Sequence, residues 1–169
     1  MNYIISQLIV GIAFIISLTT YHKKAKKNIL TTAIISNTLK LIHYILLNAT
    51  SGYTTKILGI LRDIIIVKKE KYKCLSSNII FYTFIIIYIL ISILTYKDLT
   101  SLFPLIAALI YLIPIWNGNA LTVKKAAFIS SIFWLMYDIS IFSITSIISD
   151  IVFSVSILIA LTNPKITLT

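Results

Sequence analysis

Long apolar stretches constrain this chain more than any other feature of its sequence. The whole chain has a mean hydropathy of +0.99 and only 12% charged residues, and each stretch approaches the ~20 residues that a helix needs to cross a hydrocarbon core. The seven stretches cover residues 3–20, 29–48, 52–67, 78–95, 99–115, 123–143 and 144–162. We therefore expect an all-α membrane protein with seven transmembrane helices. No basic residue precedes the first stretch, which favours a helix there over a removable signal peptide.

The positions of the basic residues predict the orientation. The net charge of +10 would suggest nucleic acid as a partner if it formed one patch. Instead, the lysines gather in alternate loops: Lys23, Lys24, Lys26, Lys27, then Lys68, Lys69, Lys71, Lys73, then Lys124, Lys125 and Lys165. The opposite loops carry only Lys97, beside Asp98. By the positive-inside rule the N-terminus is outside and the C-terminus inside, and the expected partner is the lipid bilayer rather than nucleic acid.

An internal repeat relates the two halves of the chain. A shift of 94 residues aligns Ala13 with Ala107 and Ser36 with Ser130 without a gap, and it also aligns basic clusters and short uncharged turns. The first three and the last three helices then cross the membrane in the same direction, as in a parallel repeat. We expect a 3+1+3 arrangement with a first unit at 1–73, a linker helix at 74–97 and a second unit at 98–169.

Polar side chains recur at helical spacing inside four of the apolar stretches. An ionisable group near the bilayer centre costs at least ~2.5 kcal/mol, so such groups normally face the interior of a bundle. The spacing places them on common helix faces. The candidate substrate-binding residues are Lys40, His43, Lys56, Arg62, Trp134, Tyr137, Asp138 and Asp150.

Two interpretations of these polar stripes stay open. In the functional one they line a polar cavity in the outer half of the membrane; in the structural one they only hold the two halves together. Lys56 and Asp150 superimpose under the 94-residue shift and are candidates for a buried ion pair. For His43, a structural hydrogen-bond donor is favoured over a pH switch.

Enzymatic chemistry has no recognisable motif here. The sequence has no metal-ligand spacing of histidine, cysteine or carboxylates, no glycine-rich phosphate loop and no nucleophile motif. Its single cysteine, Cys74, cannot form an internal disulfide. We expect no enzymatic activity, no cofactor and no bound metal.

The stretch from Phe133 to Asp138 resembles a motif of the SWEET sugar facilitators. It contains W-x-x-Y, and Asp150 follows Trp134 by sixteen residues, where that family has an asparagine. The resemblance implies the 3+1+3 layout that SWEET proteins share with PQ-loop proteins, PnuC-type carriers and the KDEL receptor. It also implies that Trp134 and Asp150 border the substrate. Lys40 and Lys56 at the matching first-half positions argue against a neutral sugar.

A resemblance to YgjV-type bacterial inner-membrane proteins covers nearly the whole chain. The residues that carry it are Ser6, Gln7, Ile12, Ala13, Phe14, Thr19, Thr20, His43, Leu46, Leu47, Arg62, Leu102, Pro104 and the stretch from Trp134 to Asp150. The resemblance implies a multi-pass protein of the bacterial cytoplasmic (inner) membrane, and it names no substrate.

These observations predict a transporter or facilitator for a small polar or charged solute that binds in a central cavity between the two units. Two alternatives stay open: a ligand-binding or sensing membrane protein of KDEL-receptor-like architecture, and a structural membrane protein. The expected partners are lipid and the solute, and a homo-oligomer is left open.

Overall fold

The computed structural model describes residues 2–69 and 71–162, and the regular structure within them is entirely helical. Each apolar stretch of the sequence forms one α-helix, as predicted, and a short 3₁₀ helix precedes the fifth. The order is α1 (Asn2–Leu18), α2 (Lys26–Leu46), α3 (Thr50–Lys69), η1 (Lys73–Ser76), α4 (Asn78–Leu94), η2 (Leu99–Leu102), α5 (Phe103–Asn117), α6 (Ala120–Ser140) and α7 (Ile144–Thr162). Lys165, which the sequence analysis placed in a basic cluster, lies outside the described residues.

Local sequence explains where several helices begin and end. The side chains of Ser77 and Asn119 accept hydrogen bonds from backbone amides in the first turns of α4 and α6, whose amides have no partner within the helix. Pro104 lies in the first turn of α5, where the missing N–H is not needed. Directly after α2 and α6, Asn48 and Phe142 adopt left-handed φ angles of 54° and 52°. The chain therefore reverses within a few residues, and α3 and α7 return antiparallel to α2 and α6.

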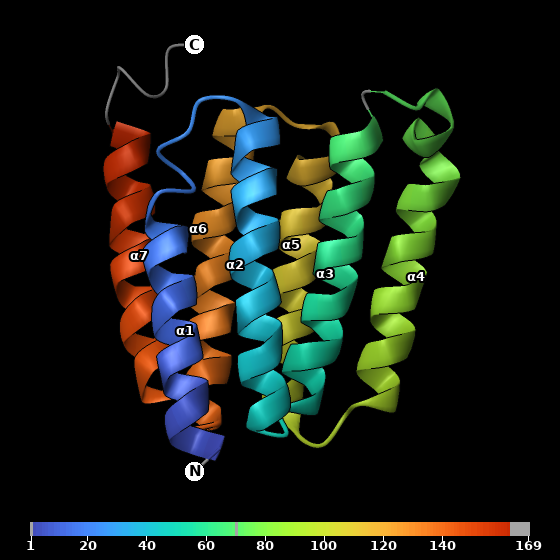
Figure 1. Ribbon diagram of the computed structural model, residues 1–169. Helices are drawn as coiled ribbons and strands as arrows, with labels where there is room; N and C mark the ends of the chain where they lie inside the picture. The colour runs from blue at the N-terminus through green and yellow to red at the C-terminus, as the bar shows by residue number, and fades with distance from the viewer. Residues whose placement is uncertain (1, 70, 163–169) are drawn as a thin grey trace.

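The helices form one bundle. In it α2 packs between α1 and α3, and α6 packs between α5 and α7. The two groups meet where α1 contacts α7 and where α3 contacts α5. α4 lies at the margin of the bundle, against α3 and α5 (Figure 1). The start of α1 and the end of α7 lie at opposite ends of the bundle (Figure 1).

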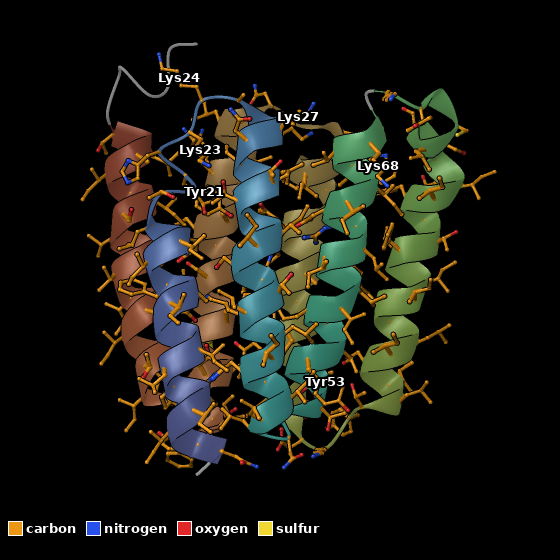
Figure 2. The ribbon with its side chains drawn as sticks, in the orientation of Figure 1. Tyr21, Lys23, Lys24, Lys27, Tyr53 and Lys68 are labelled. Atoms are coloured by element: carbon orange, nitrogen blue, oxygen red, sulfur yellow. The ribbon has the colours of Figure 1, made fainter. Side chains whose placement is uncertain are left out.

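The sides of the bundle are apolar, and one end is basic. Every helix exposes large hydrophobic side chains, with Leu94 83% exposed. By length and composition, three helical segments of the described residues can cross a membrane: α2, the combined segment Leu99–Asn117, and α7; α1 and α4 are shorter apolar helices. Figure 2 shows Tyr53 near one end of the bundle and the four labelled lysines near the other end: Lys23, Lys24, Lys27 and Lys68. This is the surface of a membrane protein.

Two apolar clusters lie at different depths of the bundle. The larger one is near the lysine-rich end, where Ile29, Val123 and Ile157 are fully buried. The smaller one is aromatic, centred on Tyr44 and Tyr137 close to the short turns after α2 and α6. Polar and charged side chains are also buried in the bundle, among them Asp63, Asp138 and Asp150. The fold thereby removes them from contact with lipid.

Candidate functional site

All eight candidate residues lie inside the bundle. Lys40 and Trp134 are half-buried, and the other six are buried: His43, Lys56, Arg62, Tyr137, Asp138 and Asp150. They come from α2, α3, α6 and α7, so the four polar stripes face one another. Because a charged group exposed to lipid is costly, this placement is the one that a membrane allows.

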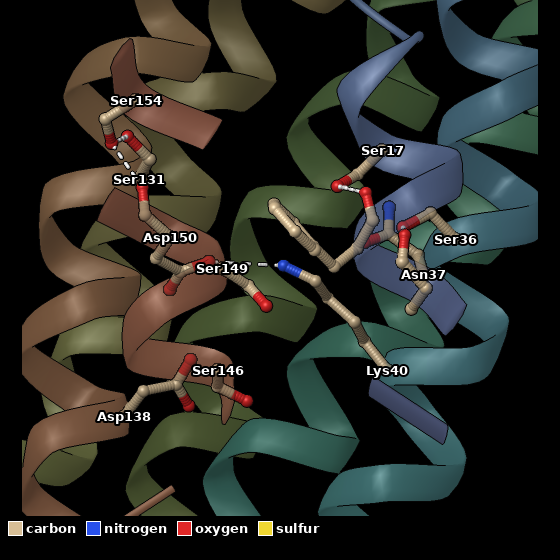
Figure 3. Close-up of polar contacts among 12 residues, drawn as sticks. Ser17, Ser36, Asn37, Lys40, Ser131, Asp138, Ser146, Ser149, Asp150 and Ser154 are labelled. Carbon is tan, nitrogen blue, oxygen red and sulfur yellow. Dashed lines mark hydrogen bonds and ion pairs between the residues drawn. The ribbon is translucent and has the colours of Figure 1, made fainter. Parts of the chain in front are cut away.

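An ion pair joins α2 to α7. Lys40 Nζ lies 3.2 Å from Asp150 Oδ1, and the two side chains are 12% and 2% exposed (Figure 3). The candidate pair of Lys56 with Asp150, which the sequence left open, is not formed, because Lys40 pairs with Asp150 and Lys56 contacts Asn37 on α2 and Trp134 on α6. Breaking a buried pair leaves an uncompensated charge, so each partner of this pair depends on the other.

Lys56 on α3 is a buried cation that forms no ion pair within the described residues. Its Nζ lies 3.6 Å from the centre of the Trp134 ring and 3.3 Å from Asn37 Oδ1, to which it donates a hydrogen bond. Neither partner carries a negative charge, and the ion pairs found within residues 2–69 and 71–162 do not include Lys56. A desolvated cation–π contact contributes about 2 kcal/mol, which offsets only part of the desolvation of a buried ammonium. Lys56 can therefore accept an anionic partner.

Asp138 on α6 lies next to Asp150. Its Oδ1 accepts a hydrogen bond of 2.9 Å from the Tyr44 hydroxyl, and its carboxyl group lies near that of Asp150 (Figure 3). The Oδ2 atoms of both aspartates are buried and have no hydrogen-bond partner in the described structure. Figure 3 shows the two carboxyl groups close together, with Lys40 approaching Asp150 from the facing helix. Two neighbouring carboxyl groups thus share a single lysine.

Arg62 is neutralised by the residue that follows it. Its Nε and a terminal nitrogen approach Asp63 Oδ1 at 2.9 and 2.8 Å, with both side chains almost fully buried. The guanidinium also lies 5.0 Å from the centre of the Tyr111 ring and 3.5 Å from the Tyr88 hydroxyl of α4. The linker helix α4 therefore contacts Arg62, whose charge is already paired with that of Asp63.

Tyr137 and Gly52 bring α6 close to α3 near the short turns. The Tyr137 hydroxyl oxygen accepts hydrogen bonds of 3.0 Å from Ser51 Oγ and from the Gly52 amide. A Cβ atom on Gly52 would lie 2.8 Å from the Tyr137 ring, a distance that the packing does not allow. Glycine is therefore required here by close approach of the helices.

His43 is fully bonded on both ring nitrogens. Nδ1 lies 2.9 Å from the Ser6 carbonyl oxygen, so it must carry the hydrogen. In the neutral ring Nε2 is then an acceptor, and the hydroxyl groups of Ser143 and Ser146 lie 3.0 Å from it. The histidine thus ties together α1, α2 and α7, an arrangement that suits a structural histidine.

A pocket of about 100 Å³ lies among the charged side chains. Its walls come from all seven α-helices and include Lys40, Lys56, Arg62, Trp134 and Asp150, whereas His43, Tyr137 and Asp138 do not line it. Along α1 only its last turn and the following residues reach the pocket, namely Ser17, Thr20 and Tyr21. That turn adjoins the first lysine-rich loop. The pocket thus reaches toward the lysine-rich end, and its expected position in the outer half of the membrane stays a prediction.

The sequence matches the family model Imp-YgjV, described as a bacterial inner membrane protein, over residues 4–164. The chain belongs to this family. The predicted YgjV-type relationship is therefore confirmed, and the bacterial inner membrane is the location that the family description gives. No curated protein and no solved structure matches the chain.

Several residues of the pocket escaped the analysis of the sequence. Tyr88 lies in α4, which the repeat treats as a linker, and Tyr111 and Tyr21 share a hydrogen bond of 3.2 Å at the lysine-rich end. Tyrosine is common in apolar helices near membrane interfaces. These tyrosines could therefore not be recognised as pocket residues from the sequence. Asn37, the acceptor for Lys56, lies three residues before Lys40 on α2 and is not among the eight predicted residues.

Proposed function

We propose that this protein is a carrier for a small polar or charged solute, with no enzymatic activity, and that all seven helices cross the inner membrane. The observation that carries the proposal is the pocket lined by every α-helix and holding Lys56, a buried cation without a carboxylate partner in the described part of the chain. An unpaired intramembrane charge facing a cavity is typical of a substrate pathway.

Seven crossings are supported by the places of the charged residues in α3 and α6. These two helices have 20 and 21 residues, enough to span a hydrocarbon core, although they carry five and three charged residues. Lys56, Arg62, Asp63 and Asp138 on these helices are buried in the bundle rather than exposed to lipid. The gathering of lysines at one end supports an N-out orientation through the positive-inside rule (Figure 2).

A 3+1+3 arrangement, with α4 as the linker, is supported by contacts that recur 94 residues apart. Ser36 Oγ donates to the Ala13 carbonyl at 3.0 Å, and Ser130 Oγ donates to the Ala107 carbonyl at 2.9 Å. The left-handed residues after α2 and α6 are separated by the same offset. Tyr44 and Asp138, also 94 positions apart, contact each other as residues beside a pseudo-twofold axis would. This layout extends the proposal to a relationship with the SWEET-like carriers.

The proposed mechanism is rocking of one three-helix unit against the other around the pocket. In the described state the pocket is closed toward the short turns by the aromatic cluster of Tyr44, Tyr137 and Trp134. The lysine-rich side is closed by the larger apolar cluster, in which Tyr21 and Tyr111 line the pocket and share a hydrogen bond. Both sets of contacts must loosen in turn for a solute to pass.

A sensing protein that binds a ligand without moving it is the second candidate. The observation that favours it is the network around His43 and Tyr137, which ties five helices together at the short-turn side. A carrier must open this side in each cycle, whereas a sensor can keep it closed.

Purified full-length protein distinguishes these candidates. Amino acids, organic anions, nucleosides and sugars are first tested for thermal stabilisation in detergent, and each stabilising solute is then tested for counterflow in liposomes. A carrier gives stabilisation and counterflow with the same solute. Stabilisation without counterflow selects the sensor, and no stabilisation by any solute contradicts both. Lys56→Met is the matched variant that should lose the effect, and Lys71→Met in the exposed loop should keep it.

A further inference from the structure

The carboxyl groups of Asp138 and Asp150 form a buried pair. In the described part of the chain, the Oδ2 atom of each residue has no hydrogen-bond partner. The two residues are 0% and 1% exposed, and their carboxyl groups lie close together (Figure 3). Two adjacent carboxylates cannot both be ionised in a site of low dielectric constant. One proton between the two groups would give each unsatisfied oxygen a partner.

The remaining contacts of the pair suit a single negative charge. Lys40 provides one positive charge to Asp150 at 3.2 Å, and the Tyr44 hydroxyl donates to Asp138 at 2.9 Å. Among the elements packed around the pair, the titratable and charged groups are Lys40, His43 and Tyr44 on α2, Lys56, Arg62 and Asp63 on α3, and Tyr137 on α6. Arg62 and Asp63 compensate each other, and His43 is held by Ser6 and two serines as a neutral ring.

The charges around the pocket do not cancel when this proton is present. Three cations face or adjoin the pocket: Lys40, Lys56 and Arg62. Asp63 compensates Arg62, and the shared negative charge of Asp138 and Asp150 compensates Lys40. One positive charge is left over, and it belongs to Lys56, which lies over Trp134. A bound monoanion would remove this imbalance.

We infer that the pocket binds one small organic anion together with one proton: the anion on Lys56 and Trp134, and the proton between Asp138 and Asp150. This inference rests on the proposed carrier function and specifies its substrate class. The proton adds to one carboxylate of the pair and leaves the other ionised against Lys40. An anion and a proton together add no net charge. A pocket that holds both therefore has the same net charge as an empty pocket in which both carboxylates are ionised. Release of the proton makes the site neutral and weakens its attraction for the anion.

The proton is tested by infrared absorption of the full-length protein in a detergent without ester groups, at neutral pH. The chain has only five acidic residues, so the carbonyl band of a protonated carboxyl group is simple to assign. We expect one such band in the wild type and in the control Asp98→Asn. We expect no band in Asp138→Asn or Asp150→Asn, because the remaining carboxylate pairs with Lys40. Lys56→Met should keep the band.

The anion is tested by thermal stabilisation with lactate and pyruvate, and with their uncharged amides as matched controls. Only the acids should stabilise the protein, and their affinity should fall about tenfold per pH unit once the pair loses its proton, as one bound proton per anion requires. Asp138→Asn should bind the anion without this pH dependence.

Each remaining outcome contradicts part of the inference. A wild type without the carbonyl band, or a band that survives in both aspartate variants, overturns the shared proton. Equal stabilisation by amides or by cations overturns the choice of an anion while leaving a carrier for another solute. If no solute of any charge stabilises the protein, the proposed function fails, and the infrared result still decides whether the proton is there.

Discussion

Two side-chain contacts, or crossings, join the halves of the bundle. They differ in charge although they occupy positions related by the repeat. α2 meets α7 through Lys40 and Asp150, at 3.2 Å, and α3 meets α6 through Lys56 and the ring of Trp134, at 3.6 Å. The 94-residue shift carries Lys40 onto Trp134 and Lys56 onto Asp150, so it converts one crossing into the other. In our account the first crossing fastens the halves together, and the second leaves a cation available for a ligand. The same helix geometry can therefore serve stability on one side and binding on the other.

Loss of the ion pair is expected to have the largest effect. Lys40→Ala should lower the free energy of unfolding by about 3 kcal/mol, because the negative charge of the aspartates stays buried without its partner. Denaturation of the purified protein in detergent, followed by tryptophan fluorescence, measures this loss. A change below about 1 kcal/mol would mean that water reaches the pair and that the crossing is not fastened by it.

Exchange of the charges sharpens the comparison. Lys40→Asp combined with Asp150→Lys should recover about 2 kcal/mol relative to either single change, because opposite charges again face each other. Lys56→Asp combined with Asp150→Lys should recover little, since those side chains are not paired in the structure. Recovery by the second exchange alone would reverse the assignment of the two crossings.

Lys56→Met is the matched change at the second crossing. Its expected effect on solute affinity is a loss of tenfold or more, or about 1.4 kcal/mol, while stability is kept, because a desolvated cation is replaced by an apolar chain of similar length. Titration of the best solute by thermal shift measures the affinity. Unchanged affinity would show that Lys56 does not bind the solute. Severe unfolding would show that Lys56 holds the two halves together, as Lys40 does.

The two related serine hydrogen bonds should contribute equally. Ser36→Ala and Ser130→Ala each remove one bond to a backbone carbonyl, and each should lower the unfolding free energy by about 1 kcal/mol. Chemical denaturation of both variants in parallel measures the difference. Effects that differ by more than about 1 kcal/mol would show that the halves are not equivalent at this contact.

The smallest effect is expected outside both crossings, at Asp98. Hydrogen bonds from the Thr100 hydroxyl and the Ser101 amide lower the pKa of this exposed carboxyl group. Its contribution to stability is present above the unfolded-state pKa and is lost as the pH falls below about 4 through the lower folded-state value. Asp98→Asn should remove this loss and change the melting temperature by about 2 °C or less. A thermal melt at each pH measures this change in melting temperature. A larger change would mean that the hydrogen bonds of Asp98 at the start of η2 contribute more to stability than expected.

The fold was largely predictable from the sequence. Apolar stretches of membrane-spanning length predict all seven helices and their approximate bounds. Partner choice inside the bundle was not predictable, because a lysine side chain is long enough to reach several facing helices. The sequence alignment therefore suggested Lys56 for Asp150, whereas the structure pairs Lys40 with it.

The sequence predicted that the eight candidate residues face the interior of the bundle, but not which of them line the pocket or what surrounds it. Helical spacing brought the stripes of α2, α3, α6 and α7 together, but the position of the pocket depends on where aromatic side chains close the interior. Tyr44 and Tyr137 close it toward the short turns, and only their packing shows this. Gly52 could likewise not be distinguished from an ordinary helix-packing glycine until Tyr137 was seen against it.

The central claim is that a solute moves through the pocket by way of Lys56. Its most direct test is counterflow of the best-bound solute in liposomes that contain wild type, Lys56→Met or Lys71→Met. We predict saturable exchange by wild type and Lys71→Met, and at least a tenfold lower rate for Lys56→Met at the same amount of inserted protein. Equal exchange by Lys56→Met, or no exchange by the wild type, would contradict the account.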